Sequence, residues 1–463
     1  MIKDLTRGTP LKLIVQFAFP ILIGNIFQQF FQISDILIVG RLLGVEALAA
    51  VGASAPIFFM FLMIAFGFTA GLTIITAQKF GARNVTGIKS SVFHSTLAAL
   101  ILGTLVAILL VFFLKPILKL MNVPSEILDQ SYIFMLILGI AIIPIVFYNL
   151  LSGFIRALGD SKTPLYFLIF SSILNIVLNF VFIYYFKWGV AGSACGTFAS
   201  VVVSAIACIW FIKKRIPLLQ LTFNDCKYNH QFMMEHLRVA VPMALQFSIL
   251  ALSMMIVQSV CNSFGTEVIA GFTAAMRIEQ ISTQPLFAFG IAFATYAAQN
   301  YGAALIRRIR QGVRQCLVAC LFLSIATSLA VRFFGANWVA IFIENGNDNI
   351  VNIGQQYLMI STCFYFFLSC IFIVRNALQG MGKTKFPLIS GFIELIMRSV
   401  AVIYLSHKIG YTGVFWAGPI AWLGGAVVVL IGYWWVIKKL KPRDMKEIFL
   451  KKQQIQIQES AIN

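Results

Sequence analysis

Long apolar runs, separated by short polar connections, occupy almost the whole sequence. Twelve of these runs are about as long as the roughly 20 residues that an α-helix needs to cross a bilayer. They lie near residues 14–39, 48–76, 93–114, 128–155, 164–186, 191–212, 239–263, 268–298, 313–334, 350–374, 386–406 and 411–436. Because the runs are continuously apolar and do not alternate with period two, they predict an all-α polytopic membrane protein with twelve transmembrane helices and exclude an outer-membrane barrel.

The second half of the sequence repeats the first at an offset of 221 to 223 residues. The motif Ala77-Gln78 followed by Gly81-Ala82 returns as Ala298-Gln299 followed by Gly302-Ala303. Other pairs with this offset are Glu46 and Glu267, Pro20 and Pro242, Gly159 and Gly382, and Gly189 and Gly410. The sequence therefore predicts two six-helix repeats, an organisation typical of transporters whose substrate site lies between the halves.

The charge distribution indicates membrane topology and not nucleic-acid binding. The chain is 60% hydrophobic and only 11% charged, which cannot be accommodated in one water-soluble core. Its net charge of +19 comes mainly from Lys and Arg at the N-terminus and in the even-numbered connections. Because cytoplasmic loops carry such an excess, we expect a multi-pass plasma-membrane protein (the inner membrane in bacteria) with both termini cytoplasmic and parallel repeats.

Polar connections divide the predicted chain into four parts. Residues 1–212 and 239–437 are expected to form the two six-helix lobes. The longest and most polar connection, 213–238, is expected to be a cytoplasmic linker between the lobes. Residues 438–463 form a basic tail that we expect to contact anionic lipid. We expect the protein to be a monomer.

Several functional classes lack the residues that they require. The eight cysteines include no CxxC pair and the four histidines are dispersed, so neither a disulfide framework nor a metal site is indicated. The sequence has no GxxxxGK[ST] phosphate loop, and the predicted spans hold no cluster of nucleophile, base and metal ligands. We therefore expect no enzyme and no cofactor, and an ion gradient as the energy source.

Four polar residues of the first span lie on one stripe. Asn25, Gln28, Gln32 and Asp35 are spaced by three, four and three residues, which places them on one helical face. A charged residue within a span costs at least about 2.5 kcal/mol, so it usually faces a water-filled cavity or a partner. We expect Asp35 to take part in ion coupling and the other three to line a substrate cavity, although Asp35 could also be an interfacial carboxylate.

The fifth and sixth spans add uncharged polar groups. Asn175 and Asn179 are four residues apart and share a face, and Thr197 lies in a glycine-containing run of the next span. With Asp35, their oxygens would suit a hard cation or a relay around a titrating carboxyl group. Hydrogen bonding between helices is an equally good interpretation of these residues.

The second repeat has no acid equivalent to Asp35 but contains four other charged candidates. Arg277 and Glu279 lie in the eighth span and point in different directions, so each needs a separate partner. Glu394 and Arg398 in the eleventh span are four residues apart, which predicts a structural ion pair along one helix more strongly than a substrate contact.

The order of motifs along both repeats resembles the multidrug and toxic-compound extrusion (MATE) family. The resemblance covers nearly the whole chain and includes Gln28-Gln29, Asp35, Leu43-Gly44, Ala47 to Ala50, the loop Arg156 to Pro164 and its counterpart Gln379 to Pro387. It implies a V-shaped, two-lobed carrier that exports amphipathic, often cationic compounds by proton or sodium antiport. The implied partners are therefore a small amphipathic substrate and membrane lipids.

Within this family, the DinF-like branch is the more similar. The resemblance implies coupling through Asp35, Asn175 and Thr197, whereas Asn179 stands where that branch usually has an aspartate. The NorM-like branch places acids in helices 7 and 10, and the corresponding runs 239–263 and 350–374 have none, although Glu279 or Glu394 could supply a second-lobe alternative. Pro20 lacks an N–H group for the helix ladder, which makes it a candidate hinge in the first helix.

Two alternatives remain at this point. A lipid-linked oligosaccharide flippase of the same wider superfamily would also have helical repeats, although twelve spans without an additional carboxyl-terminal pair disfavour it. A membrane-embedded enzyme would need a reactive cluster that the spans lack. Substrate identity and the choice between H⁺ and Na⁺ are not encoded in any motif that we identify.

Overall fold

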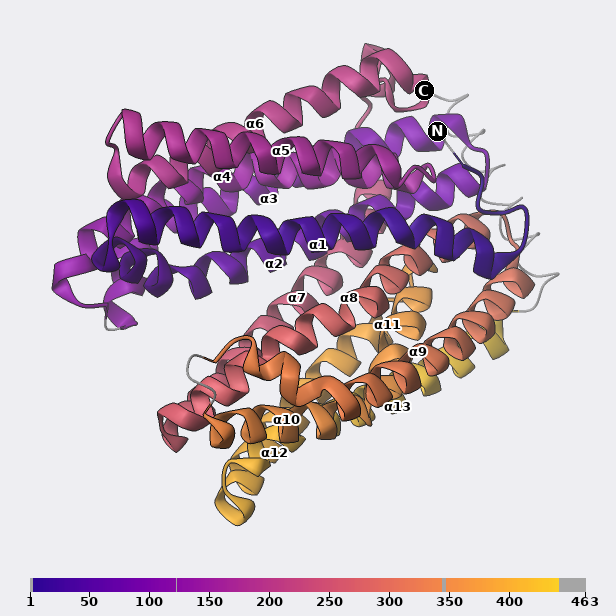
Figure 1. The fold of residues 1–463 in the computed structure, drawn as a ribbon. Helices are drawn as coiled ribbons and strands as arrows, with labels where there is room; N and C mark the ends of the chain where they lie inside the picture. The colour runs from indigo at the N-terminus through magenta and orange to yellow at the C-terminus, as the bar shows by residue number, and fades with distance from the viewer. Residues whose placement is uncertain (1–2, 122, 344–346, 441–463) are drawn as a thin grey trace. The chain divides into compact units, whose positions relative to one another are not determined.

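The computed structural model describes residues 3–121, 123–343 and 347–440, apart from the side chain of Gln32. All regular elements in these residues are helical, as the sequence predicts (Figure 1). The first repeat contains α1 (Pro10–Leu43), α2 (Val45–Gly81), α3 (Val85–Leu120), α4 (Ser125–Ala157), α5 (Lys162–Phe180) and α6 (Gly189–Arg215). The second contains α7 (His230–Cys261), α8 (Thr266–Gly302), α9 (Ile306–Ala340), α10 (Asp348–Thr362), α11 (Tyr365–Gly380), α12 (Lys385–Ile409) and α13 (Thr412–Lys439).

Most of these helices are suited to crossing a membrane. Ten described helices are long and apolar enough, and α10 with α11 adds one more span if the pair, bent by 51°, is counted together. The remaining predicted span is α8, whose 37 residues include three charged side chains that lower its hydropathy. Each of the twelve predicted spans coincides with a helix or with the bent pair, so the prediction of an all-α polytopic membrane protein is confirmed.

One predicted span differs in detail from the structure. The apolar run 350–374 predicts a single continuous helix, but the chain breaks at Cys363 and Phe364, between α10 and α11. Hydropathy stays high across this break, and no proline or glycine marks it. The sequence pattern therefore identifies the span without showing its bend.

The repeat is also visible in the backbone of the connections. Gly44 and Gly265, which precede α2 and α8, have φ angles of +85° and +86°. Arg83 and Ala304, at equivalent places after the same two helices, have φ angles of +55° and +59°. Glycine adopts this left-handed region at little cost because it has no Cβ. The two repeats therefore turn the chain in the same way at equivalent positions.

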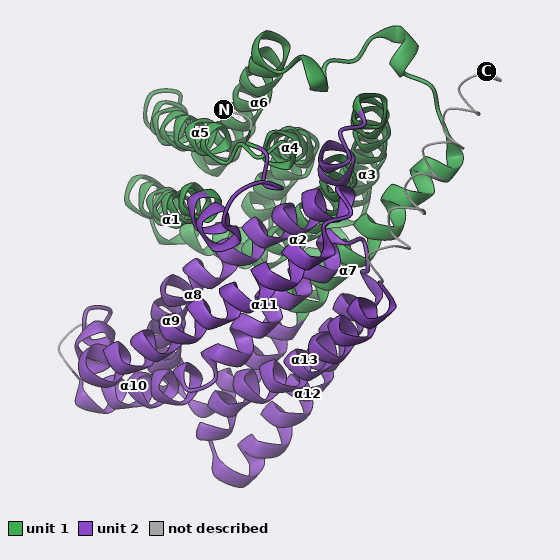
Figure 2. Cartoon of the chain, turned by 90° about the vertical axis from the view of Figure 1, so that its right-hand side faces the viewer, with its two compact units in different colours: residues 1–3, 17–76, 85–252 green, residues 4–16, 77–84, 253–463 purple. Residues whose placement is uncertain are grey.

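The chain divides into two compact units, which are shown in different colours in Figure 2. Unit 1 comprises residues 1–3, 17–76 and 85–252, and unit 2 comprises residues 4–16, 77–84 and 253–463. The division passes through three helices, α1 after Gln16, α2 after Thr76 and α7 after Leu252. Within α1, it falls one turn before Pro20.

The two copies of the repeated motif, at residues 77–82 and 298–303, pack against each other inside unit 2. A Cβ atom on Gly81, at the end of α2, would lie 1.9 Å from the carbonyl oxygen of Gln299 in α8. Reciprocally, a Cβ atom on Gly302 would lie 1.9 Å from the carbonyl oxygen of Gln78. Because only a hydrogen atom fits at these positions, the glycines allow the two helix ends to approach each other.

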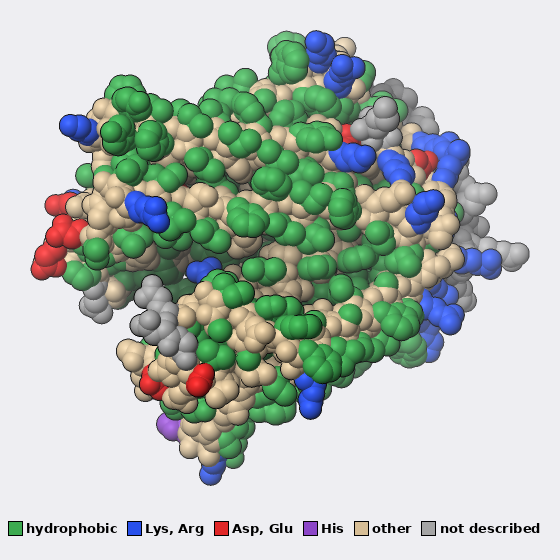
Figure 3. Space-filling model, in the orientation of Figure 1, with side chains coloured by type: hydrophobic (Ala, Val, Ile, Leu, Met, Phe, Trp, Pro, Cys, Tyr) green, Lys and Arg blue, Asp and Glu red, His purple; other side chains and the backbone are tan. Residues whose placement is uncertain are grey.

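Tryptophan and lysine side chains pair near the ends of α6 and α13. Lys214 Nζ lies 4.9 Å from the ring centre of Trp210, and Lys438 Nζ lies 4.8 Å from that of Trp434. Both residue types favour the boundary between hydrocarbon and water. On the face drawn in Figure 3, hydrophobic side chains cover the middle of the helices, and Lys and Arg gather at the right-hand end. These features fit helices embedded in a bilayer.

The connection between α6 and α7 is held against α3 within unit 1. It contains two short 3-10 turns, Pro217–Leu219 and Phe223–Asp225. Asp225 Oδ2 accepts a hydrogen bond from Lys89 Nζ at 3.0 Å, and the backbone N–H of Asn229 donates to His94 Nε2 at 2.9 Å. The connection is therefore anchored at two points.

Candidate functional site

Unit 1 contains a polar cluster built by α1, α5 and α6. Asp35 comes from α1, Asn175 and Asn179 from α5, and Ser193 and Thr197 from α6. The two asparagines are 1% and 0% exposed, whereas Asp35 and Thr197 are half-buried. The structure thus brings together all four residues that the sequence singles out as an ion-coupling group.

Hydrogen bonds connect the members of this cluster. Asn179 Nδ2 donates to Asp35 Oδ1 and also to Asn175 Oδ1, the latter at 3.0 Å. Asn175 Nδ2 donates to Thr197 Oγ1 at 3.0 Å. Ser193 Oγ donates to Asp35 Oδ1 at 3.1 Å. Because the carboxylate accepts from both α5 and α6, a change in its charge would alter contacts of α1 with both helices.

The local backbone makes room for these side chains. A Cβ atom on Gly196 in α6 would lie 2.0 Å from Asn179 Oδ1, so glycine leaves the space that the asparagine fills. Directly after Phe180, the chain forms a π-helical turn over Val181–Tyr185. Wider turns of this kind are frequent at functional sites.

The cluster includes oxygen atoms of types that can bind a proton or a cation. Asn179 Oδ1 is buried and has no hydrogen-bond partner among the described residues. With Asp35 and Thr197, it offers carboxylate, amide and hydroxyl oxygens of the kind that a hard cation prefers. A proton on Asp35, with water at the amide oxygen, would satisfy the same atoms. Within the described residues, no group of three or more His, Cys, Asp or Glu side chains could hold a metal ion.

Sequence reasoning missed Ser193, which binds Asp35 directly. Ser193 precedes Thr197 by four residues in the same run, so the two share one face of α6. The helical spacing that links Asn175 to Asn179 could therefore also have identified Ser193.

The other polar residues of α1 make no hydrogen bond to this cluster in the described part of the chain. Asn25 is half-buried, and its Nδ2 atom is buried without a hydrogen-bond partner among the described residues. Gln28 is exposed, and the side chain of Gln32 lies outside the described residues. Pro20 is buried within α1, which continues through it as a helix.

A second set of buried ionisable side chains lies in unit 2. Glu279 on α8 is 8% exposed and accepts a hydrogen bond from the hydroxyl group of Tyr357 on α10. Arg277, two residues away, is exposed and lies on a different face of the helix. The structure therefore separates these two neighbours, as their spacing predicts.

The prediction that Glu394 pairs with Arg398 is wrong, because each of the two residues has a different partner. Glu394 on α12 instead pairs with Arg375 on α11 and accepts from Ser390 Oγ at 2.9 Å. Arg398 Nη1 donates to Ser253 Oγ of α7 at 3.0 Å. Spacing along one helix shows which residues can meet, but a neighbouring helix here brings a competing guanidinium group to the carboxylate.

Sequence reasoning also missed Arg375 and Tyr357. Arg375 directly follows the predicted span 350–374, so the sequence assigns it to the connection, whereas in the structure α11 continues to Gly380. Tyr357 is one of 13 tyrosines, and its spacing reveals nothing about its contact with another helix. Only tertiary structure identifies these two partners.

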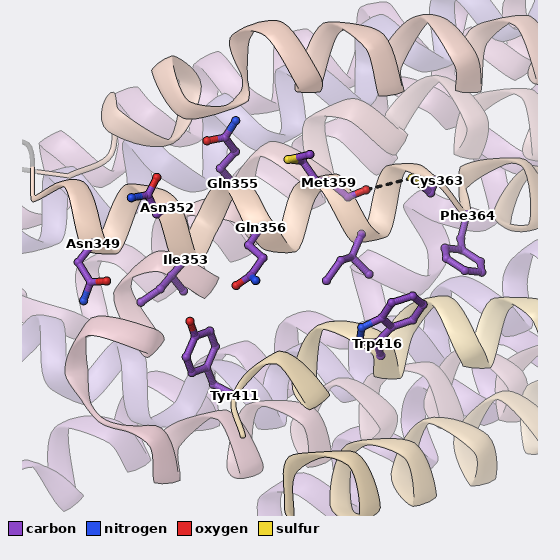
Figure 4. Close-up of a pocket in the computed structure, with 11 residues that line it drawn as sticks. Asn349, Asn352, Ile353, Gln355, Gln356, Met359, Cys363, Phe364, Tyr411 and Trp416 are labelled. Carbon is purple, nitrogen blue, oxygen red and sulfur yellow. Dashed lines mark hydrogen bonds between the residues drawn. The ribbon is translucent and has the colours of Figure 1, made fainter. Parts of the chain in front are cut away.

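Unit 2 also has an open groove of about 600 Å³ between α10 and the start of α13. Figure 4 shows the amide side chains of Asn352 and Gln356 on α10, with Tyr411 and Trp416 on the other side. No carboxylate or basic side chain lines this groove in the described part of the chain. It contains none of the residues that the sequence singles out.

Repeated six-helix halves with polar and charged side chains among their spans are typical of membrane transporters. The chain belongs to the MatE family, since the family model matches residues 20–181 and 242–405, one segment in each repeat. It is therefore a transporter and not an enzyme. The resemblance noted in the sequence is confirmed.

Curated relatives of similar length support this assignment. The chain is 30% identical over 416 residues to the probable multidrug resistance protein YpnP of Bacillus subtilis, a match that covers 89% of this chain and 92% of that protein. It is 20% identical over 410 residues to the multidrug export protein MepA of Staphylococcus aureus, covering 89% and 90%.

Solved structures have the same fold. A MATE protein in the bent conformation matches with a TM-score of 0.87 at 25% identity, over 96% of this chain and 98% of that chain. An outward-facing multidrug resistance MATE family transporter matches with a TM-score of 0.87 at 25% identity, over 95% and 98%.

Proposed function

We propose that the chain is a secondary active multidrug efflux transporter that exports amphipathic, cationic small molecules by proton or sodium antiport. The observation that carries this proposal is the Asp35 carboxylate, which accepts hydrogen bonds from α5 and α6. The names of YpnP and MepA support drugs as the substrate class. Asp35 is the group that binds the coupling ion.

Ion binding at Asp35 would change its hydrogen bonds. An ionised Asp35 accepts from Asn179 and Ser193, but a proton or a sodium ion would occupy an oxygen and neutralise the charge that strengthens these bonds. The contacts of α1 with α5 and α6 then favour a different arrangement. Substrate leaves because its affinity differs between the two arrangements.

Pro20 is the proposed flexing point of α1. Its ring removes one backbone hydrogen bond from the helix, which lowers the cost of bending there. The division between the two units crosses α1 just before this residue, after Gln16. That a similar MATE protein is known in bent and straight conformations supports a conformational change of this general kind.

We place the protein in the plasma membrane with both termini in the cytoplasm, and we propose that it acts as a monomer. The excess of Lys and Arg in alternate connections supports this orientation. We retain 1–212 and 239–437 as lobes joined by 213–238. The proposed lipid-binding tail, 438–463, falls outside the described residues apart from its first three positions.

The names of the relatives favour efflux over the alternative of a lipid-linked oligosaccharide flippase. YpnP and MepA are both named for drug resistance or export, and each match covers about nine-tenths of this chain. We therefore propose drug efflux alone as the activity to test.

The test is export of ethidium from cells under separately imposed proton and sodium gradients. Asp35→Asn keeps the size of the side chain but cannot take up a proton or hold a charge. We expect this change to lower gradient-driven export at least about tenfold, since the coupling group is lost. Asp129→Asn, at an exposed position of α4, is the matched control and should behave as the unmodified chain does.

Export that keeps its rate and gradient dependence in Asp35→Asn would refute the coupling role. If the expressed unmodified chain exports no dye under either gradient, the proposal of drug efflux fails. If Asp35→Asn loses export under only one of the two gradients, the ion of that gradient is the coupling ion.

A further inference from the structure

Unit 2 contains a groove that neither the Asp35 cluster nor the buried charges of α8, α11 and α12 use. The groove has a volume of about 600 Å³ and lies between α10 and the start of α13 (Figure 4). Small-molecule sites in proteins commonly have volumes of about 300–1,000 Å³ and combine apolar walls with a few polar groups. The groove therefore has the size of a ligand site.

The lining of this groove changes from polar to apolar along α10. The amide side chains all lie in the part of α10 before Met359, and the thiol of Cys363 and the ring of Phe364 lie beyond it. α10 has 15 residues and is therefore roughly 22 Å long. Figure 4 shows Tyr411 across from the amides and Trp416 across from the apolar part. An amphipathic molecule lying along α10 would find a polar place for its head and an apolar place for its tail.

The polar groups of the lining have no partners in the described part of the chain. The amides of Asn352, Gln355 and Gln356 make no hydrogen bond among the described residues. The same holds for the hydroxyl group of Tyr411 and the indole N–H of Trp416. Amide and hydroxyl groups within a span are costly unless they are hydrogen-bonded. These groups therefore need water or a polar ligand.

Charge restricts which head the groove can take. No charged side chain lines it in the described part of the chain, so it offers neither a cation to a phosphate nor a carboxylate to an ammonium group. At the rim, Asn349 Nδ2 donates to Glu267 Oε2 at 2.6 Å, and Asp348 begins α10. These two acids repel an anionic head. The head that fits is therefore uncharged.

Hydroxyl groups of a sugar match the unpartnered amides. A primary amide both donates and accepts hydrogen bonds, as a hydroxyl group does, so Asn352, Gln355 and Gln356 can bind neighbouring hydroxyl groups of one ring. Tyr411 adds a hydroxyl group and an apolar ring face, to which the C–H side of a sugar can pack. Trp416 lies beyond the amides, and tryptophan favours the boundary between polar groups and hydrocarbon.

The proposed orientation places the groove in the outer half of the bilayer. With both termini cytoplasmic, an odd number of spans precedes α10 and also precedes α13, so both helices begin at the outer surface. The amides then lie near the outer surface, and the apolar part of the groove lies deeper. A lipid of the outer leaflet has the same order, with its head outward and its acyl chains inward.

We propose that this groove binds a neutral glycolipid of the outer leaflet, with the sugar on the amides of α10 and an acyl chain along Met359 and Phe364. The inference goes beyond drug efflux and does not depend on it, because it concerns a lipid that the chain holds and not one that it exports. It depends on the orientation of α10 only for the choice of leaflet.

The first repeat is not expected to hold a second copy of this lipid. The groove at the equivalent place in unit 1 has a volume of about 310 Å³ and is lined by Glu46, Gln130 and Trp188 among others. It is smaller, and it carries a carboxylate. We therefore expect one glycolipid per chain.

Native mass spectrometry of the purified chain tests the proposal, in a detergent without a sugar group so that the detergent does not compete. The probe is monoglucosyl diacylglycerol, compared with diacylglycerol, phosphatidylethanolamine and phosphatidylglycerol of the same acyl chains. We expect one glycolipid per chain, bound at least about tenfold more tightly than each of the other three lipids.

A double variant tests the amides. Asn352→Leu with Gln356→Leu changes no charge and places apolar side chains at exposed positions of a span, and it should weaken glycolipid binding about tenfold. Asn337→Leu is the matched control, because this exposed amide of α9 lies outside the groove. It should bind glycolipid as the unmodified chain does.

Alkylation of cysteines locates the lipid without any substitution. Cys363 is exposed and lines the groove, whereas Cys226 is exposed in the connection between α6 and α7. Glycolipid should slow maleimide alkylation of Cys363, followed by peptide mass spectrometry, and leave the rate at Cys226 unchanged. This result remains informative if the double variant does not fold.

Four results would each overturn the inference. They are equal binding of diacylglycerol or a phospholipid, unchanged glycolipid binding by the double variant, bound glycolipid without protection of Cys363, and displacement of the glycolipid by ethidium. The last would show that the groove belongs to the export path. Glycolipid binding by a chain that exports no ethidium would refute drug efflux alone and leave this inference intact.

Discussion

At the scale of single residues, the polar cluster of unit 1 depends on a glycine, Gly196, as much as on its polar side chains. Asp35 contacts α5 through Asn179, and Asn179 fits only because position 196 is glycine. Polar groups that share several bonds are sensitive to small displacements, since one shift disturbs several partners. Gly196 is therefore a positioning residue for the proposed coupling site.

Gly196→Ala tests this dependence. The added Cβ would lie 2.0 Å from Asn179 Oδ1, so the amide must move away from Asp35. We expect gradient-driven ethidium export to fall by roughly tenfold or more, with a loss of stability of about 1–3 kcal/mol. Gly52→Ala, where nothing lies within 4 Å of the new atom, should leave both unchanged. Equal export by the two variants would show that the position of Asn179 does not matter.

The ion pair of Arg375 with Glu394 leads to a separate prediction about stability. Glu394→Gln leaves a buried guanidinium group without its counter-charge, which typically costs about 3–5 kcal/mol. We expect a clear drop in the thermal unfolding midpoint in detergent. The double variant Arg375→Met with Glu394→Leu should recover much of it, because neither charge remains buried. A double variant as unstable as the sum of its single changes would contradict this interpretation.

Sequence reasoning at this scale succeeded where contacts follow helical spacing. Asn175 and Asn179 share a face of α5 by their spacing alone, and the structure joins them by a hydrogen bond of 3.0 Å. It failed for Arg375, because the choice between Arg398 and Arg375 as the partner of Glu394 depends on a neighbouring helix. Local periodicity carries no information about which helices become neighbours.

At the scale of elements, the helices themselves were predictable because bilayer thickness imposes their length. Long apolar runs leave few alternatives to a helix, since every backbone polar group must be satisfied internally. The bend of 51° between α10 and α11 was not predictable, because hydropathy continues across it. The fold class followed from composition, whereas this break depends on packing.

The connection between α6 and α7 gives a pH prediction. Hydrogen bonds from Thr222 and Lys89 lower the pKa of Asp225 from its usual 3.8 to about 2. Because the pKa of Asp225 is lowered, its hydrogen bonds stabilise the connection fully at pH values above the usual pKa. This stabilisation is lost as the pH falls from about 4 to about 2. Hydrogen exchange at Thr222 and Asp225, corrected for the intrinsic rate, should therefore rise in this range.

Asp225→Asn should raise exchange at the same amides already at pH 7 and remove the acid transition. Asp4→Asn is a control for the substitution, at an acid that lies elsewhere in the chain. Strong protection of Thr222 in Asp225→Asn would show that the carboxylate does not hold the turn.

At the scale of the whole molecule, the two units combine a repeated fold with unequal chemistry. The polar cluster of unit 1 contains a single acid among amides and hydroxyl groups, whereas the buried charged cluster of unit 2 contains two acids and two arginines. The repeat in sequence predicts equivalent helices and turns, but it cannot predict equivalent sites once polar positions have diverged. Each unit therefore requires its own functional test.

In the proposed antiport, substrate and ion move in opposite directions through this one chain. The most direct measurement is ion flux in liposomes that contain the purified protein, driven only by a gradient of ethidium, with a pH indicator and radioactive sodium as readouts. We predict that ethidium moving one way drives protons or sodium the other way, and that Asp35→Asn abolishes this flux. Ethidium movement without any opposing ion flux in the unmodified chain would contradict antiport.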